Sequence, residues 1–392
     1  MSEIRVNSLG NESNTGGPVL SGITTFSGQQ YFIPPTGTTA ERPSECPPGS
    51  IRFNTDSAHL EYWSGLVWLE FEASSEHVGV STFAAGISAA GTGTRGLTGG
   101  GYSSSKQDVI DYFTISTLGN SVDFGNLSEA RYWTSSHASR TRGVWGGGGV
   151  APTSPNKTDR IDFVTISSTG DATDFGNLDA SRYGLGSCSN QTRGLFGGGY
   201  QPPGSQVSNV DYITIASTGD AKDFGDLTYA RYYLSSLSSS VRGLFLSGRS
   251  GTDPYTYYNT IDYVTISSQG NVQDFGDLLA TVSSGQAASN PTRGIYSGRE
   301  NTPHTKTIQF ITIATTGNAQ DFGDLTSNQP QGSATASPTR CVIPGGYQTA
   351  ISSYVNTIQF VTIATTGDAA DFGELSAIRG NTGSCSNGHG GL

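Results

Sequence analysis

The residues that could do chemistry in this chain recur at a regular spacing, but they lack the partners that catalysis needs. The triplet Asp-Phe-Gly occurs six times, with its aspartates at Asp123, Asp174, Asp223, Asp274, Asp321 and Asp371. Such an aspartate binds magnesium in protein kinases, where it acts beside a catalytic HRD loop. No HRD-type or Walker-type segment accompanies any of the six copies. We therefore interpret the triplet as a structural motif.

The potential metal ligands do not form a set either. The five histidines (59, 77, 137, 304 and 389) do not recur with the repeat, and the four cysteines (46, 188, 341 and 385) include no CxxC pair. We expect Cys188 and Cys385, which lie in identical GSCSN segments, to be free thiols. Calcium binding by turn aspartates such as Asp171 and Asp174 stays open beside the more common capping of turns. The sequence thus predicts no enzyme, no cofactor and no metal site.

The composition narrows the possible partners. The 392 residues carry a formal net charge of −11, and only 14% of them are charged. A nucleic-acid partner would require clustered Lys and Arg, so we expect none. The start MSEIRVNSLG has no apolar h-region, and no stretch approaches 18 apolar residues. We expect neither a signal peptide nor insertion into a membrane.

The recurring triplets belong to a longer repeat that must position them. Each of six units opens on an arginine, continues through a glycine cluster and an apolar run such as DYITI, and closes on DFG. The opening arginines are Arg95, Arg142, Arg193, Arg242, Arg293 and Arg340. Their spacings of 47, 51, 49, 51 and 47 residues lie in the range of β-propeller blades. We expect an all-β fold, with a six-bladed propeller over residues 81–392.

Each unit reads as four strands. A Ser-rich strand is innermost; the Arg-Gly strand, the apolar run and the DFG strand follow. The apolar run has apolar residues on both faces, as with Ile110 and Tyr112 against Phe113 and Ile115, which favours a sheet covered on both sides. Gly-Asp and Gly-Asn pairs predict the hairpins. The Ser-rich segment occurs seven times, at 81–94 and 380–391 among others, so we expect the two chain ends to meet and leave open which copy closes the fold.

This strand order, with its Gly cluster after the second strand, resembles the kelch repeat. The resemblance covers about 300 residues. It implies a propeller, but the Tyr and Trp pair usual in kelch blades is replaced here by the phenylalanine of DFG. The chain therefore resembles a divergent branch of that family.

The connections between the second and third strands vary in length and content, whereas the hairpins are uniform. In such a blade the variable connections share one face, which we expect to be the recognition surface; neutral drift of these loops remains the alternative. Aromatic residues among Ser and Asn suit a glycan or a protein surface. The candidate recognition residues are Tyr102, Tyr200, Tyr255, Tyr257, Tyr258 and Tyr347.

Residues 1–80 differ from the repeats. A polar arm and a Pro-rich lead precede strand-like runs at 50–54, 58–63 and 66–71, which predict a small β-meander. A unit of this size usually needs partners, so we expect residues 1–80 to be an attachment or oligomerisation region. A homotrimer of the chain is one possible oligomer. Packing of the meander on its own propeller is the alternative. The candidate attachment residues are Phe26, Tyr31, Phe32, Phe53, Tyr62, Trp63 and Trp68.

The segment GSIRFNTDSAHLEYWSGLVWLEF, after its Pro-rich lead, resembles a segment of fibre-like structural proteins of tailed phages, especially marine ones. The shared pattern is P-G-x-I-R-[FY]-N followed by L-E-[FY]-x-x-G-x-W, over about 45 residues. The resemblance implies a virion component, assembled in the host cytoplasm, that joins other virion proteins through residues 1–80. The propeller would then bind a glycan or protein of the host surface. A kelch-type interaction module outside a virus and a glycan-active enzyme are the alternatives.

Overall fold

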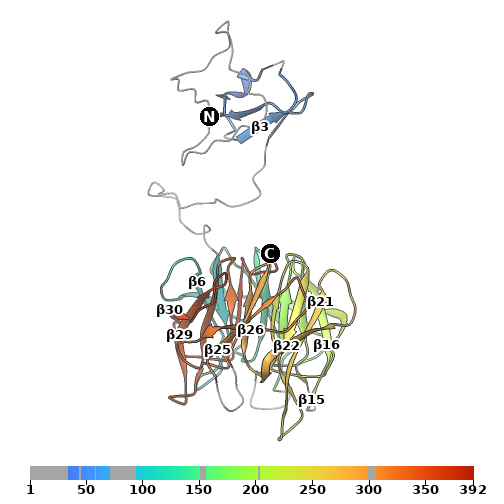
Figure 1. Cartoon of the computed structure of the whole chain (residues 1–392), viewed down its shortest axis with the longest axis vertical. Coiled ribbons are helices and arrows are strands. Elements are labelled where there is room, and N and C mark those ends of the chain that lie inside the picture. The colour runs from blue at the N-terminus through green and yellow to red at the C-terminus, as the bar shows by residue number, and fades with distance from the viewer. Residues whose placement is uncertain are drawn as a thin grey trace, which may run out of the picture. The chain divides into compact units, whose positions relative to one another are not determined.

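The computed structural model describes residues 34–43, 46–57, 59–70, 94–150, 156–201, 204–298 and 305–392. It divides the chain into two compact units, Met1–Ala85 and Gly86–Leu392. The described residues form β-strands and one short 3-10 helix, η1 (Thr39–Glu41), so the predicted all-β class is confirmed (Figure 1). The Ser-rich copy before the first repeat and the aromatic residues Phe26, Tyr31 and Phe32 lie outside the described residues.

The N-terminal unit contains one four-stranded sheet. Its strands, in spatial order, are β1 (Thr36–Gly37), β2 (Ile51–Asn54), β3 (His59–Trp63) and β4 (Trp68–Glu70). Strands β2 to β4 form the antiparallel meander that the sequence predicts. The two-residue strand β1 lies parallel to β2, and it is too short for sequence alternation to reveal it.

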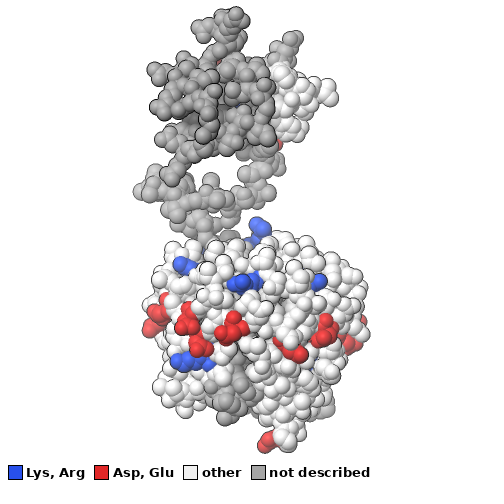
Figure 2. All heavy atoms as spheres, viewed as in Figure 1, with Lys and Arg blue, Asp and Glu red and all other residues white. Residues whose placement is uncertain are grey.

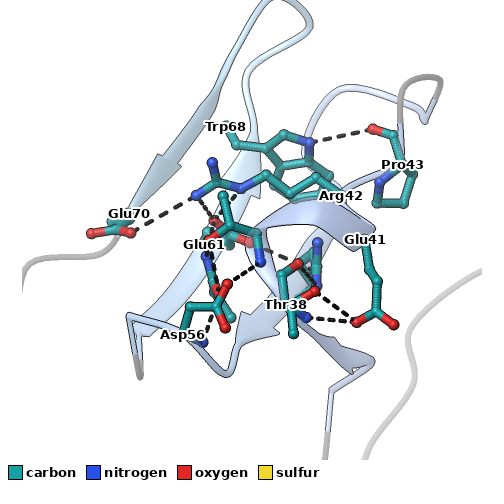
Figure 3. A network of polar contacts seen from close by, with 11 residues as sticks. Thr38, Glu41, Arg42, Pro43, Asp56, Glu61, Trp68 and Glu70 are labelled. Atoms are coloured by element: carbon teal, nitrogen blue, oxygen red, sulfur yellow. Dashed lines mark hydrogen bonds and ion pairs between the residues drawn. The ribbon is translucent and has the colours of Figure 1, made fainter.

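A buried polar network fills one face of this sheet (Figure 3). The carboxylate of Glu61 is fully buried and accepts hydrogen bonds from Nε and Nη2 of Arg42, at 3.0 and 2.6 Å. The guanidinium of Arg52 lies 3.6 Å from the other oxygen of Glu61. Burial alone would raise the pKa of Glu61, but the hydrogen bond and the charge of Arg42 outweigh it and hold this pKa below its ordinary value. The unit thus keeps an ionised carboxylate at its centre.

The described residues of the second unit form six antiparallel sheets of four main strands each, and we call this unit the six-sheet unit. We number the sheets along the chain and give each from its first to its fourth strand. The first three sheets are β31 (Gly383–Ser386), β5 (Arg95–Gly99), β6 (Val109–Thr114), β7 (Val122–Asn126); β8 (Ser135–Ala138), β9 (Arg142–Gly146), β10 (Arg160–Thr165), β11 (Thr173–Asn177); and β12 (Gly186–Ser189), β13 (Arg193–Gly197), β16 (Asn209–Thr214), β17 (Lys222–Asp226).

The other three sheets are β18 (Ser235–Ser238), β19 (Arg242–Leu246), β21 (Thr256–Thr265), β22 (Gln273–Val282); β23 (Gln286–Ser289), β24 (Arg293–Ser297), β25 (Thr307–Thr312), β26 (Gln320–Asp324); and β27 (Thr335–Ala336), β28 (Arg340–Gln348), β29 (Ser353–Thr362), β30 (Ala370–Glu374). Three short strands lie in the connections: β14 (Tyr200–Gln201), β15 (Ser205–Gln206) and β20 (Arg249–Ser250). The fourth sheet gains a short fifth strand where β20 pairs with β21. Each repeat therefore supplies the last three strands of one sheet.

The first strand of the first sheet comes from the far end of the chain. Strand β31 pairs with β5, with Gly383 opposite Gly99 and Cys385 opposite Leu97. The C-terminal copy of the Ser-rich segment thus occupies this place. First strands also contact one another between sheets, in the order β8, β12, β18, β23, β27, β31 and back to β8. The ends of the repeat array consequently lie together, as the sequence predicts.

The DFG triplets join neighbouring sheets. Every phenylalanine of the triplet is buried, and every glycine has a φ near +145° to +150°. A Cβ on Gly125 would collide with the carbonyl oxygen of Gly170 in the hairpin of the next sheet, and the amide of Gly170 donates to Phe124 O at 2.8 Å. The same contact recurs at all six junctions, ending with Gly373 against Gly119. The glycine permits close approach of two backbones, as the sequence predicts.

The aspartates of these triplets are all exposed, and Figure 2 shows acidic side chains along the side of the six-sheet unit. The turn residues next to them have a different use. Asp171 accepts a hydrogen bond from the backbone amide of Asn126 at 2.9 Å, and the equivalent Asp or Asn does so at each of the other five junctions. The turn aspartates of the repeat therefore cap the neighbouring sheet, and the aspartates of the DFG triplets face solvent.

The opening arginine of each repeat also crosses a junction. Arg95 stacks over Tyr112 of its own sheet, with 4.6 Å from guanidinium to ring centre, and donates to the carbonyl oxygen of Ile166 in the next sheet at 2.7 Å. All six opening arginines make the same pair of contacts. The last of them, Arg340, donates at 3.1 Å to Ile115 in the first sheet. The junction between the chain ends is thus built like the others.

Four junctions bury a second arginine against an aspartate. The pairs and their N–O distances are Arg131–Asp162 (2.9 Å), Arg182–Asp211 (2.5 Å), Arg231–Asp262 (3.0 Å) and Arg379–Asp111 (3.0 Å). Burial lowers the pKa of Arg131, Arg231 and Arg379. Such charges are tolerated inside a protein only when each has its partner.

The two remaining junctions replace the charged pair as a unit. In the sixth sheet Gln359 Nε2 donates to Gln329 Oε1 at 2.5 Å, and both residues occupy the positions of the pair. In the fifth sheet the aspartate position is Gln309, which accepts from the amide of Leu279 at 2.8 Å, and the arginine position is the apolar Val282. An unpaired buried charge occurs at none of the six junctions.

Candidate functional site

A circuit of backbone hydrogen bonds surrounds one end of the first strands. It is formed by the residue that follows Arg-Tyr in each repeat, or by its equivalent, and each of these residues has a positive φ. The six are Trp133 (53°), Gly184 (67°), Tyr233 (58°), Ser284 (57°), Gln331 (63°) and Asn381 (59°). The amide of each donates to the carbonyl of the preceding member, at 2.5–3.1 Å, and Trp133 donates to Asn381, which closes the circuit.

Positive φ is uncommon for bulky residues and costs about 1–3 kcal/mol at each position. Gly184 adopts it without a side-chain clash, but Trp133 and Tyr233 do not have that freedom. The circuit directs the amide of each residue to the neighbouring carbonyl, so this conformation is imposed by the arrangement of the sheets. Two large aromatic side chains are thereby held at fixed places on this end of the unit.

These aromatic residues belong to a continuous cluster. The ring centres of Trp133 and Tyr233 are 4.1 Å apart, and Tyr233 also contacts Tyr183 and Tyr232, at 5.9 and 4.6 Å. The predicted Tyr200 joins the same cluster, 5.6 Å from Tyr183. Outside the cluster, Arg249 stacks on Tyr233 at 4.7 Å and on the exposed Tyr255 at 4.2 Å. Lys157 lies 4.9 Å from the ring centre of Tyr200.

A second cluster lies around the junction of the sixth and first sheets. The predicted Tyr102 contacts Tyr132 and Tyr354, at 5.5 and 6.0 Å, and the predicted Tyr347 contacts Tyr354 at 5.4 Å. The structure therefore distributes the predicted tyrosines over two clusters rather than one site.

Tyr257 and Tyr258 are the remaining candidates from the sequence. The ring of Tyr257 lies 6.4 Å from that of Tyr255, and Tyr258 stacks on Tyr229 at 5.4 Å. Among the six predicted tyrosines only Tyr255 is exposed; the other five are half-buried. We call this end of the six-sheet unit the loop side. In Figure 1 strand β15 marks it, and the C-terminus lies at the opposite end of that unit.

A cavity opens between the first strands at the loop side, and we call it the loop-side cavity. All six sheets line it, from Trp133 and Tyr233 at the circuit to Ser136, Ser187 and Ser236 further in. Its lining contains Ser, Thr, Gly, Ala, Leu, Asn and Gln beside the two aromatic residues, and no charged side chain. Small residues at this place agree with the innermost strand that the sequence predicts.

A second cavity, the tail-side cavity, adjoins the first and shares Ser136, Ser187 and Ser236 with it. Residues 387–392, the C-terminal tail, lie across its end. His389 Nε2 lies 2.8 Å from Ala138 O, and the amide of Gly390 donates to Ser289 O at 2.7 Å.

Two histidines at this end, the buried His137 and the half-buried His389, give a prediction about pH. Burial lowers the pKa of His137 to about 3 and that of His389 to about 4, against 6.5 for a free side chain. Below pH 6.5 the unfolded chain binds protons that the folded chain does not, so the free energy of unfolding falls as the pH drops from about 6.5 to 4. Each histidine contributes roughly 1.4 kcal/mol per pH unit. Thermal unfolding at pH 7 and pH 5 measures this loss.

The variant His389→Gln removes one of the two groups, and its midpoint is expected to fall less between these pH values than that of the wild type. His59→Gln, at a half-exposed side chain in the N-terminal unit, is the matched control. An equal fall in the wild type and in His389→Gln would show that His389 is not held neutral by burial.

The described attachment candidates lie on the N-terminal sheet. Phe53, Tyr62, Trp63 and Trp68 are half-buried, and the rings of the two tryptophans are 5.6 Å apart. Phe53 and Tyr62 share a face with three exposed apolar residues, because Phe53 pairs with Leu60, and Tyr62 with Ile51 and Leu69. The exposed fractions of Ile51, Leu60 and Leu69 are 51%, 41% and 40%. We call these five residues the apolar face.

Within the described ranges, no group of three or more His, Cys, Asp or Glu residues could hold a metal ion. All four cysteines are free thiols, as predicted for Cys188 and Cys385. Among the same residues no helix is long and apolar enough to span a membrane. No known protein family matches the chain, and no curated protein is similar to it in sequence.

Proposed function

We propose that the chain is a non-enzymatic structural protein of a virus particle. Its N-terminal unit attaches it to other virion proteins, and its six sheets are the blades of a six-bladed β-propeller that binds a host surface. The observation that carries the proposal is the apolar face of the N-terminal unit, which belongs to the segment that resembles phage fibre-like proteins. The propeller is supported by the six equivalent junctions and by the circuit of backbone hydrogen bonds.

The apolar face supports attachment because the same small sheet already has an internal core on its other side. Arg52 and Glu61 alternate with Phe53 and Leu60 along the strands, so the polar network and the apolar face are on opposite sides. Exposed apolar surface of this kind is typical of a binding site for another protein. The homotrimer expected from the sequence is one arrangement that would cover it.

The test has two parts. First, the chain should be found by mass spectrometry in particles purified from cells that carry its gene; its absence from those particles would contradict the proposal. Second, Leu60→Ser combined with Leu69→Ser should reduce incorporation into particles at least tenfold, because burial of two leucines contributes about 3–6 kcal/mol. Incorporation is measured by quantitative immunoblot of purified particles.

The control is Leu118→Ser, which changes a more exposed leucine of the six-sheet unit (59% exposed). This variant should be incorporated like the wild type. An equal loss of incorporation in both variants would indicate a general defect in solubility. Incorporation of both variants at the wild-type level would contradict the role of the apolar face in attachment.

A further inference from the structure

We propose that the loop-side cavity binds the uncharged terminal sugar of a saccharide chain. Trp133 and Tyr233 form its aromatic wall, and Asn381 supplies a hydrogen-bond acceptor. The inference rests on the proposed host-surface binding and assigns it to a site and a class of ligand. It moves the site from the variable loops, where the sequence places it, to the circuit of positive-φ residues.

The aromatic wall is pre-organised. Both rings line the cavity and are half-buried, so part of each stays accessible. They extend from backbone positions that the circuit fixes, and their ring centres are 4.1 Å apart. A sugar ring presents a face of C–H groups that packs on such a surface, and little conformational freedom is lost because the wall does not have to form on binding.

The wall includes an acceptor that lacks a partner. Asn381 lines the cavity and is only 5% exposed. The Nδ2 of its side-chain amide donates to Tyr354 Oη at 3.2 Å. Its Oδ1 is buried without a hydrogen-bond partner among the described residues. A buried acceptor without a donor costs about 1–3 kcal/mol. Because this oxygen is buried, a ligand hydroxyl in the cavity would donate to it only after the Asn381 amide turns toward the ligand.

The lining also disfavours charged ligands. None of the residues that line the loop-side cavity is charged. Two cations lie on rings of the aromatic cluster without lining the cavity: Arg249 stacks on Tyr233 of its wall, and Lys157 lies over Tyr200. Bringing a carboxylate or phosphate into this cavity would remove its hydration without an opposite charge to replace it. Neutral hydroxyl and acetamido groups, in contrast, match the Ser, Thr, Asn and Gln side chains.

The shape favours the end of a chain over its middle. From the loop side the two cavities follow one another between the first strands, and the C-terminal tail lies across the far end. Gly390 and Gly391 pack so closely on Ser238 and Ser189 that a Cβ on either would collide with their carbonyl oxygens. A saccharide can therefore enter from the loop side but cannot pass through.

The experiment measures binding of the full-length chain to an array of immobilised oligosaccharides. One set ends in glucose, galactose, mannose, rhamnose or N-acetylglucosamine, and the other ends in sialic or glucuronic acid. We expect binding to one or more members of the uncharged set and none to the acidic set. Trp133→Gly should weaken that binding about tenfold, the loss expected for one aromatic contact.

Trp133→Gly is chosen because Gly184 occupies the equivalent place in the circuit, so the variant keeps the required φ. It loses the ring contact with Tyr233, so its thermal midpoint is measured beside its binding. Asn381→Gly removes the side-chain acceptor, and glycine at this position can also adopt the positive φ of the circuit. Tyr255→Ala, at the exposed tyrosine of the loop side, is the matched control and should bind like the wild type.

Binding that requires an acidic terminus, or that Tyr255→Ala abolishes while Trp133→Gly retains it, would overturn the assignment to this cavity. Absence of binding to every member of the array would overturn it as well. Adsorption of the chain to host cells is measured in parallel. If Trp133→Gly adsorbs to the cells as the wild type does, only the assignment of the site to this cavity is contradicted. If the wild-type chain adsorbs to no cell, the proposed function itself is contradicted.

Discussion

Replacing Arg379 with leucine is expected to lower the free energy of unfolding of the six-sheet unit by about 3–5 kcal/mol, because it leaves a buried charge without its partner. The guanidinium lies 3.0 Å from the carboxylate of Asp111 and also donates to Val109 O at 2.8 Å. Both side chains are fully buried. Asp111 would keep its hydrogen bonds from Ser376 but lose its counter-charge. Urea unfolding followed by tryptophan fluorescence measures the change.

The chain itself supplies the control for this experiment. Arg379→Gln combined with Asp111→Gln reproduces the Gln329–Gln359 pair of the neighbouring junction and should recover most of the lost stability. Arg140→Leu, at an exposed arginine, should change the unfolding midpoint little. A single variant Arg379→Leu as stable as the double variant would show that charge pairing is not what this junction requires.

The strands could be predicted because their signal is local. The run at 109–114 shows apolar residues on both faces in the sequence, and Ile110 and Phe113 are indeed buried on opposite sides of its strand. The Gly-Asp pairs mark hairpins because positive φ leaves few alternatives to glycine. Even the close approach at Gly125 could be foreseen from a glycine that recurs within a strand.

The junction pairs were not predicted, because their two members lie in different repeats. Three pairs join residues roughly 30 positions apart, and the fourth, Arg379–Asp111, joins the last repeat to the first. A signal nevertheless exists inside the chain. The arginine of Ala-Arg-Tyr and the aspartate before the apolar run are present together at four junctions and absent together at two. An alignment of the six repeats shows this covariation. It is expected because a buried charge without its partner costs far more free energy than replacing both members of the pair with uncharged residues.

The residues of the candidate site also occupy equivalent positions of the repeats. The residue after Arg-Tyr is Trp133, Gly184 or Tyr233 in consecutive repeats, which looks like an unconstrained position. A glycine in one copy hints at positive φ, but only the circuit shows that all six copies share it. The loop tyrosines were predicted because their loops differ in length and content from repeat to repeat, whereas the hairpins are uniform. The aromatic wall of the cavity was missed because its residues occupy a position whose residue type differs from repeat to repeat.

Ending the chain after Arg379 is expected to abolish cooperative unfolding of the monomer. The deletion removes β31, and strand β5 loses its pairing partner along residues 96–99. Leu97, which is fully buried beside Cys385, would become exposed on a sheet edge. An edge of this kind pairs readily with other chains, so the truncated protein should elute as dimers or larger assemblies in size-exclusion chromatography.

Two further proteins separate the strand from the tail. Ending the chain after Ser386 removes the tail, with its hydrogen bonds at His389 and Gly390, but keeps β31. Because few apolar contacts are lost, we expect a monomer with a cooperative transition at a lower midpoint. Adding a synthetic peptide of residues 380–392 to the longer truncation should restore the monomer, since the strand pairs through backbone groups available in the free peptide. If the chain that ends at Arg379 elutes as a monomer and unfolds at the midpoint of the wild type, β31 does not hold the first sheet together. The stability of that sheet would then have to come from β5, β6 and β7 and from their contacts across the junctions.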